Sequence, residues 1–294
     1  MSYRESAFFF ESQGEMLPGI VTTPVQEASV GVLVIVGGPQ YRVGSHRLFV
    51  QLCRRMADQG LAAMRFDFRG MGDGTGEPVP FDAHGEDIAA ALSAFRAAVP
   101  SMRQIVLLGL CDGATAAVLH AAVGRVADGL ILLNPWTSVE EGVSRTVLKH
   151  YYASRLADKG LWKKLVSGQL GLSAASRQFV AWLGASIRSL GGEPHALPTA
   201  LPARFAEAFG KTGSPALIVL SERDFVAREF EDCALVLPEF ADALDAGRAE
   251  LKRVSGADHT FSDPELADEM IRICLEWMTR RRFAQSDPEA LQCS

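Results

Sequence analysis

Apolar residues follow two spacings along this chain, short continuous runs and longer stretches with helical periodicity. The runs Val30–Val36 and Leu61–Phe66 are almost wholly apolar, which is typical of strands that helices cover on both faces. Between these runs, apolar residues recur at helical spacing from Ser45, a residue type that caps helices, to Gly60. The pattern therefore begins as strand, helix, strand.

Strand and helix patterns alternate in this way through most of the chain. The further predicted strands are Ala7–Glu11, Gly19–Thr23, Gln104–Leu110, Gly129–Leu133, Pro215–Ser221 and Glu250–Val254. The further predicted helices are Ala83–Val99, one directly after Cys111, Glu229–Leu244 and Pro264–Arg282. Such alternation predicts an α/β protein with a mostly parallel, doubly wound sheet, and the first two strands predict an antiparallel hairpin at one edge.

The alternation stops over residues 137–213. Helical patterns at Arg145–Leu156, Leu161–Val166 and Ser176–Ser189 are followed by a loop rich in glycine and proline. These features predict a helical lid inserted into a core of residues 1–136 and 214–294. The insertion carries ten lysines or arginines against five aspartates or glutamates, so its net charge is +5, whereas the whole chain carries −6. This asymmetry suggests an anionic ligand that reaches the lid.

The composition is that of a globular protein with one large domain and an insertion, with 294 residues of which 48% are hydrophobic. The net charge of −6 argues against a nucleic-acid partner, which would need a basic face. The five cysteines form no CxxC pair, so they indicate a reducing compartment and argue against a disulfide framework. The N-terminus has no signal-peptide core and no run is long enough to span a membrane, so we expect a cytoplasmic protein.

A glycine-rich turn, Asp67–Gly74, follows the second of the opening runs. It contains GxG but does not continue as GxxG, so it is a poor dinucleotide motif. We expect it to shape the rim of a pocket, with Arg69 in an ion pair. Because no metal-ligand spacing is present either, we expect neither a metal nor a cofactor.

A sharp turn joins the strand Gln104–Leu110 to the helix that follows it. The turn reads Gly109-Leu-Cys-Asp-Gly113 and places Cys111 at its apex, with glycines where strand and helix pass close together. In α/β-hydrolases this is the nucleophile elbow, which usually holds serine. A cysteine there predicts a thiol nucleophile, and the alternative is a buried cysteine that only packs.

Two later strand ends supply partners for this thiol. Asp224 follows one predicted strand and His259 follows the last, in the order nucleophile, acid, histidine that α/β-hydrolases use. Because the carboxyl ends of parallel strands meet at one edge, we expect His259 to accept the Cys111 proton and Asp224 to orient His259. Alternatives are that Glu222 is the acid or that Asp224 caps a helix, and Asp258 is expected to orient its own loop.

Attack by such a thiol on a carbonyl group produces an oxyanion, which two backbone N–H donors are needed to stabilise. The amide of Asp112, directly after the nucleophile at a helix N-terminus, is the first candidate. The second should come from the loop after Val36, where Gly38 and Gln40 are candidates and Pro39 is excluded because it has no N–H.

Nearly the whole chain resembles an α/β-hydrolase, and the Gly109–Gly113 turn resembles the cysteine elbow of dienelactone hydrolases. Five longer motifs are similar to the exosortase A system-associated hydrolases, bacterial proteins found beside exosortase and exopolysaccharide genes. These motifs are Val36–Arg47, Arg65–Asp73, Leu132–Trp136, Leu148–Tyr152 and Ala257–Ser262. Candidate substrate-binding residues within them are Tyr41, Trp136, Lys149 and Tyr152.

The chemistry of a thiol narrows the reaction class. A neighbouring His⁺ and a helix N-terminus favour the thiolate, and the acyl-enzyme would be a thioester that water, amines or thiols attack. We therefore predict an acyl hydrolase or acyltransferase that acts on an activated ester or thioester. The basic lid suits a phosphate-bearing carrier such as acyl carrier protein phosphopantetheine or CoA.

Two other functions stay open. One is a small-molecule ester or lactone hydrolase of the dienelactone type, in which basic lid residues bind a carboxylate. The other is a non-catalytic hydrolase-fold protein that binds a partner or ligand through the lid, although the set of Cys111, Asp224 and His259 argues against it.

Overall fold

The computed structural model describes residues 3–38, 40–124, 126–137, 201–281 and 283. The chain divides into two compact units, Met1–Thr137 together with Pro202–Ser294, and Ser138–Leu201. The predicted helices of the insertion, and with them the lid itself, lie outside the described residues. The first unit holds the sheet and every candidate site residue except Lys149 and Tyr152.

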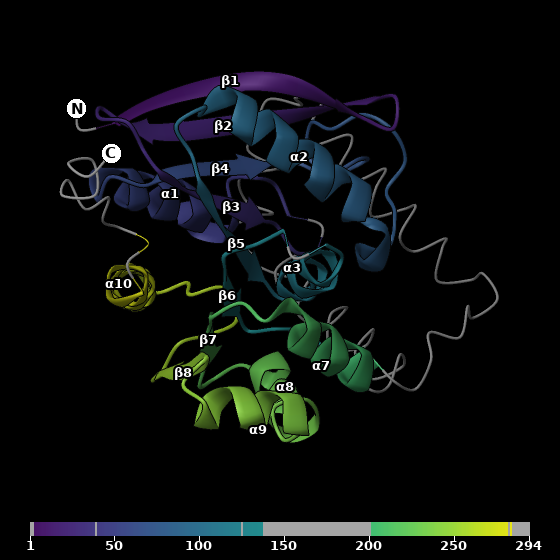
Figure 1. The fold of residues 1–294 in the computed structure, drawn as a ribbon, viewed down its shortest axis with the longest axis vertical. Helices are drawn as coiled ribbons and strands as arrows, with labels where there is room; N and C mark the ends of the chain where they lie inside the picture. The colour runs from purple at the N-terminus through teal and green to yellow at the C-terminus, as the bar shows by residue number, and fades with distance from the viewer. Residues whose placement is uncertain (1–2, 39, 125, 138–200, 282, 284–294) are drawn as a thin grey trace, which may run out of the picture. The chain divides into compact units, whose positions relative to one another are not determined.

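An eight-stranded sheet runs through the first unit. Its strands are β1 (Tyr3–Ser12), β2 (Glu15–Pro24), β3 (Val30–Ile35), β4 (Ala62–Phe66), β5 (Gln104–Leu110), β6 (Gly129–Leu133), β7 (Ala216–Ser221) and β8 (Ala249–Val254). Their spatial order is β1-β2-β4-β3-β5-β6-β7-β8, seen from the purple edge to the green edge in Figure 1. The β1–β2 and β2–β4 pairs are antiparallel and the others are parallel, which confirms a mostly parallel sheet with a hairpin at one edge.

Helices cover both faces of this sheet. They are α1 (Leu48–Asp58), α2 (Gly85–Ala98), α3 (Asp112–Ala122), α7 (Leu201–Thr212), α8 (Phe225–Cys233), α9 (Pro238–Asp245) and α10 (Pro264–Arg280). In β3, Leu33 and Ile35 join a core cluster with residues of α2, α3, α7, α8 and α9. Val32 and Val34 point the other way and join a second cluster with residues of α1 and α10. The uninterrupted apolar runs follow from this burial on both faces, because each residue meets a helix layer on one side or the other.

The predicted start of α1 is wrong. Ser45 begins a short 3₁₀ turn, Ser45–Arg47, and no side chain caps either this turn or α1. His46 and Arg47 have φ values of 53° and 62°, a left-handed conformation that an α-helix cannot contain. The α-helix therefore begins only at Leu48.

The single helix predicted over Glu229–Leu244 is two helices. The Asp224 carboxylate caps α8, so this helix begins at Phe225, and it ends at Cys233. Pro238 then opens α9 at its first turn, the one helical position where a missing N–H costs nothing. The apolar spacing over Glu229–Leu244 continues across this break, and for that reason the periodicity alone did not reveal it.

Helix α7 falls in the last part of the interval expected for the insertion. Its Phe205 and Phe209 are fully buried, and the Phe209 ring stacks on Phe240 of α9 with ring centroids 4.3 Å apart. Just after the helix, the Ser214 hydroxyl donates to the Ala127 carbonyl at 2.7 Å. These contacts group α7 with the sheet, so the core resumes at residue 202 rather than at residue 214.

Replacing Gly113 with alanine is expected to destabilise the fold by at least about 2 kcal/mol, since overpacking in a tight core commonly costs 1–3 kcal/mol. A Cβ at Gly113 would lie 2.4 Å from the Ile35 carbonyl oxygen and 2.8 Å from the Gly37 nitrogen. Both neighbours are backbone atoms held by the sheet and its first loop, so they cannot move aside. Urea unfolding monitored by circular dichroism measures the change.

The matched control is Gly85→Ala at the first residue of α2. The nearest atom to a Cβ there is Nδ1 of His120 at 3.8 Å, an ordinary contact distance. This change should leave stability unchanged or raise it slightly, because alanine loses less conformational entropy than glycine in a helix. Equal losses in the two variants would contradict the steric argument.

Candidate active site

Cys111 lies at the apex of the turn between β5 and α3, in the strained conformation φ 60°, ψ −128°. Such a conformation costs a non-glycine residue on the order of 1–3 kcal/mol, and the surrounding structure must impose it. The Cys111 N–H donates to the Leu133 carbonyl at 3.0 Å, and the Cys111 carbonyl accepts from the Trp136 N–H at 3.2 Å. A Cβ at Gly109 would lie 2.4 Å from the Gly113 carbonyl oxygen, which confirms the predicted close approach of strand and helix.

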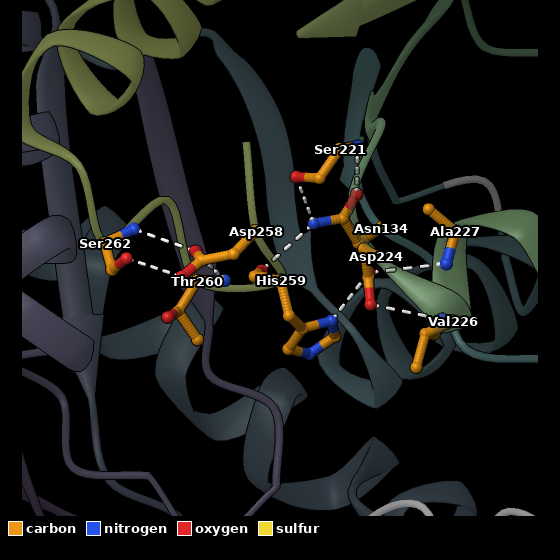
Figure 2. A network of polar contacts seen from close by, with 9 residues as sticks. All are labelled: Asn134, Ser221, Asp224, Val226, Ala227, Asp258, His259, Thr260 and Ser262. Carbon is orange, nitrogen blue, oxygen red and sulfur yellow. Dashed lines mark hydrogen bonds and ion pairs between the residues drawn. The ribbon is translucent and has the colours of Figure 1, made fainter. Parts of the chain in front are cut away.

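The side chains of Asp224 and His259 meet beside this turn. Oδ2 of Asp224 lies 2.7 Å from Nδ1 of His259, as Figure 2 shows, and the imidazole is also hydrogen bonded to the Cys111 thiol. Because Nδ1 faces a carboxylate, it carries the proton, which leaves Nε2 for the thiol. The structure thus brings together the three residues that the sequence singled out.

Asp224 combines the two roles that the sequence left as alternatives. Its Oδ1 accepts from the Val226 N–H at 3.1 Å and its Oδ2 from the Ala227 N–H at 3.3 Å, so it caps α8 while it faces His259. The neighbouring Glu222 points elsewhere and accepts from the Ser255 hydroxyl at 2.7 Å. Asp224, rather than Glu222, is therefore the carboxylate that is bonded to the histidine.

The loop that carries His259 is held by its own side chains, as predicted for Asp258. The Asp258 carboxylate accepts from the N–H groups of Thr260 at 3.2 Å and Ser262 at 2.9 Å (Figure 2). It also accepts from the Ser262 hydroxyl. Asp258 therefore shapes the loop, because all of these contacts are with other groups of the loop and none is with the histidine ring.

The protonation states of Cys111 and His259 depend on each other. Burial raises the pKa of Cys111, against the opposing pull of His259, and the nearby Asp112 carboxylate raises it further. For His259, burial acts to lower the pKa, but the Cys111 thiolate and the Asp224 carboxylate outweigh burial and hold the pKa well above its ordinary value. His259 therefore acts to lower the pKa of Cys111, as the sequence predicted, while burial and the Asp112 charge, which the sequence did not show, raise it.

The side chain of Asp112 reaches back into the loop after β3. Its Oδ1 accepts from the Gly38 N–H at 2.6 Å, and a Cβ at Gly37 would lie 2.3 Å from this oxygen. Burial raises the pKa of Asp112 to about 6, although the N–H groups of Gly38 and Gly113 stabilise its ionised form. The Gly38 N–H, predicted as an oxyanion donor, is thus already occupied, while the side-chain oxygen of Gln40 is buried without a partner among the described residues.

A buried carboxylate from the glycine-rich turn anchors the same loop. Asp67 accepts from the backbone N–H of Arg42 at 2.6 Å and from that of Asp73 at 3.0 Å. The Arg42 guanidinium pairs with both carboxylates, and the Tyr41 hydroxyl donates to Asp73. The turn therefore fixes the loop that would supply an oxyanion donor, and its Arg69 forms the predicted ion pair with Asp87 at 2.8 Å.

The candidate substrate-binding residues divide between described and undescribed segments. Trp136 lies beside the elbow, where its ring meets Phe81 edge to face with centroids 5.1 Å apart. Tyr41 is partly exposed, although its hydroxyl is engaged by Asp73. Lys149 and Tyr152 lie outside the described residues.

Sequence reasoning missed Asn134, which is fully buried at the end of β6 and bonded to the His259 loop. The signal in the sequence is an asparagine directly after a predicted strand, because asparagine is one of the few residue types that readily adopt a left-handed conformation, and its φ here is 42°. The motif Leu132–Trp136 contains it, but the motif alone does not say what it touches.

The other described cysteines are free thiols. Cys53 and Cys274 are fully buried, and burial raises the pKa of each to about 12. Cys233 is partly exposed. Among the described thiols, Cys111 alone is bonded to a histidine.

Comparison with protein families matches residues 32–270 to the Alpha/beta hydrolase family. The chain belongs to the alpha/beta hydrolase family. The sequence has no significant match among functionally curated proteins.

Solved structures share the fold of this alpha/beta hydrolase at low sequence identity. An esterase of Pyrococcus furiosus has a TM-score of 0.65 and 14% identity, with 95% of this chain and 92% of that chain covered. Est1E of Butyrivibrio proteoclasticus, solved with ferulic acid bound, has a TM-score of 0.61 and 18% identity over 93% and 98% of the two chains. Dienelactone hydrolase of Anabaena variabilis has a TM-score of 0.60 and 14% identity over 95% and 99%. These likenesses establish the fold of the hydrolase.

Two features are absent from the described residues of the hydrolase. No helix among them has both the length and the apolar character needed to cross a membrane. The same residues include no group of three or more His, Cys, Asp or Glu side chains placed to hold a metal ion.

Proposed function

We propose that this hydrolase is a cysteine-dependent acyl hydrolase or acyltransferase that acts on an activated ester or thioester. Cys111 is the nucleophile, His259 the general base and acid, and Asp224 the group that orients the imidazole. The observation that carries the proposal is the chain of contacts from Asp224 through His259 to the thiol of Cys111. Its order and its placement on a strained strand-to-helix turn match the triad arrangement of the family.

The reaction follows from these contacts. As the Cys111 proton passes to Nε2 of His259, the sulfur attacks the substrate carbonyl carbon and a tetrahedral oxyanion forms. The oxyanion collapses, the bond from carbon to the leaving oxygen or sulfur breaks, and the imidazolium returns its proton to that leaving group. The thioester left on Cys111 is then attacked by water or by an amine or thiol acceptor, whose proton His259 accepts. The bond from the acyl carbon to sulfur breaks, the imidazolium returns the proton to the Cys111 sulfur, and the acyl product leaves.

The Asp112 N–H supplies one oxyanion donor in this scheme. It lies directly after the nucleophile at the start of α3, where backbone N–H groups and the helix dipole favour negative charge. The second donor comes from the loop after β3. Because the Gly38 N–H is bonded to the Asp112 carboxylate, Gln40 is the remaining candidate.

A carrier-bound acyl group is the favoured substrate class. Transfer from one thioester to another is nearly isoenergetic, so a cysteine nucleophile suits acyl-CoA or an acyl carrier protein. The net charge of +5 over residues 137–213 supports a phosphate-bearing carrier. The resemblance of five motifs to the exosortase A system-associated hydrolases supports a role for this reaction beside exopolysaccharide genes.

The test is intact-protein mass spectrometry after mixing the hydrolase with acyl-CoAs, acyl-carrier thioesters and p-nitrophenyl esters. We expect one acyl adduct on the wild type, and on the Cys233→Ser control, that is absent from Cys111→Ala. Cys111→Ser distinguishes sulfur from oxygen chemistry, since a serine nucleophile should react with thioesters far more slowly. An equal adduct on Cys111→Ala would contradict the assignment of the nucleophile.

The pattern of reactive substrates separates the alternatives. Adducts from thioesters alone support the transferase or thioesterase, and amine acceptors then identify transfer. Adducts from simple esters alone support a small-ester hydrolase, which the structural likeness to a dienelactone hydrolase and the cysteine elbow together favour as the second candidate. Adducts from neither class favour a non-catalytic binding protein.

A further inference from the structure

Asn134 lies at the end of β6, between two residues that hold the nucleophile. Before it, the Leu133 carbonyl accepts from the Cys111 N–H at 3.0 Å. After it, the Trp136 N–H donates to the Cys111 carbonyl at 3.2 Å. The backbone on both sides of Asn134 is therefore bonded to the residue that carries the thiol.

The Asn134 side chain is bonded to the backbone of His259 and to Ser221, which ends the strand before Asp224, as Figure 2 shows. Its Nδ2 donates to the His259 carbonyl at 3.0 Å and to the Ser221 hydroxyl at 2.9 Å, and its Oδ1 accepts from the Ser221 N–H at 2.7 Å. Ser221 ends β7, and its carbonyl accepts from the Asp224 N–H at 3.2 Å. One buried amide thus joins the strand end behind Asp224 to the loop behind His259.

The chemistry of these contacts requires an asparagine. The Ser221 N–H only donates and the His259 carbonyl only accepts, so the side chain must offer an acceptor and a donor at once, which also fixes the orientation of the amide. Asparagine also tolerates the φ of 42° at this position. Because Asn134 is fully buried, its removal leaves the His259 carbonyl and the Ser221 N–H without the partners that they now have.

We propose that Asn134 is a positioning residue that sets the place of the His259 imidazole between Asp224 and Cys111. It touches neither the imidazole nor the thiol and acts through the backbone of His259. Among the described residues, the titratable groups that interact with the imidazole include Cys111, Asp224 and, through its charge, Asp112. The inference rests on the proposed function only in that His259 serves Cys111, and it does not depend on which acyl substrate is used.

The test compares Asn134→Gly with Ser221→Ala. Glycine adopts the left-handed backbone but removes every side-chain bond of Asn134, whereas Ser221→Ala removes only the bond to the serine hydroxyl and keeps the one to His259. The probe is alkylation of Cys111 by iodoacetamide, followed by mass spectrometry from neutral to alkaline pH. Acylation by whichever ester or thioester modifies the wild type is measured alongside.

In Asn134→Gly, alkylation at neutral pH should fall at least about 10-fold, since general-base assistance by a well-placed histidine is commonly worth 10²–10⁴. At alkaline pH, where the thiol ionises unaided, the rate should return to within about 2-fold of the wild type. Ser221→Ala should stay within about 3-fold of the wild type throughout. Asn134→Asp, which keeps the side-chain shape and cannot donate to the His259 carbonyl once ionised, should repeat the loss if the glycine variant does not fold.

Two results would overturn the proposal. One is an unchanged rate at neutral pH in an Asn134→Gly variant whose melting temperature has fallen, which would leave the residue a purely structural link. The other is a loss of alkylation rate in Ser221→Ala as large as the loss in Asn134→Gly. If no acyl substrate modifies the wild type, the proposed function fails, but the alkylation profiles still decide the role of Asn134.

Discussion

His259→Ala should lower the rate of Cys111 acylation at neutral pH by about 10²–10⁴-fold, the usual value of a general base. The imidazole is hydrogen bonded to the thiol and is the main group that opposes the effect of burial on the Cys111 pKa. Without it, the thiolate forms only at higher pH. The pH at half-maximal alkylation by iodoacetamide should therefore move upward in the variant, and the release of p-nitrophenol in the first turnover measures the acylation rate.

Asp224→Asn provides the control for this effect. It keeps the shape of the acid but removes the Asp224 charge, which after the Cys111 thiolate helps to hold the His259 pKa above its ordinary value. Because Asp224 acts through His259, the double variant Asp224→Asn with His259→Ala should acylate Cys111 no more slowly than His259→Ala alone. Additive losses would show that Asp224 acts on the substrate or the fold independently of the histidine.

Asp112→Ala should raise the rate of acylation about 10-fold or more, because it frees the Gly38 N–H to act beside Gln40 as an oxyanion donor, and one such donor is commonly worth 10²–10³-fold. The Asp112 carboxylate occupies the Gly38 N–H and places negative charge where the thiolate and the oxyanion develop. Asp112→Asn removes the charge but keeps an acceptor for the Gly38 N–H, so its rate should lie between those of the wild type and Asp112→Ala. First-turnover kinetics with p-nitrophenyl acetate measure all three.

The pH dependence of stability separates this effect from a general change in fold. The Asp112 pKa rises from an ordinary value near 3.8 to about 6 on folding, so the fold favours the protonated form. Asp112 therefore destabilises the folded state least when the pH is below its ordinary pKa. Its cost in folding free energy grows as the pH rises through about 6. Asp112→Asn should raise the melting temperature above that pH and change it little in acid. If Asp112→Ala acylates more slowly while it alkylates normally, the carboxyl group assists the reaction instead of obstructing it.

The sequence alone was sufficient to predict the sheet and the residues that lie around the Cys111 thiol. Strands buried on both faces read as uninterrupted apolar runs, and parallel strands bring their carboxyl ends to one edge, so Cys111, Asp224 and His259 were predictable as neighbours. The glycines of the elbow were predictable for a similar reason, since a glycine at a strand-to-helix turn indicates close backbone approach.

The remaining features depend on contacts between residues far apart in the chain. Nothing in the local sequence shows that the Asp112 side chain bends back to Gly38, or that Asn134 reaches both Ser221 and His259. The raised pKa of Cys111 likewise arises from burial, which a pattern of residue types does not measure. The start of α1 was missed because His46 and Arg47 adopt positive φ although neither is a glycine, the residue type that would indicate such a conformation in the sequence.

The elbow has a consequence for how this chain can change over generations. Its strained turn is imposed by backbone bonds to β6 and by the missing side chains of Gly109 and Gly113, and none of these contacts involves sulfur. Cysteine and serine codons differ by a single base, so one mutation at position 111 exchanges the proposed attacking atom while the backbone contacts of the turn are kept. Descendants of this gene can therefore exchange cysteine for serine at this position, or serine for cysteine, without any change in the fold of the turn.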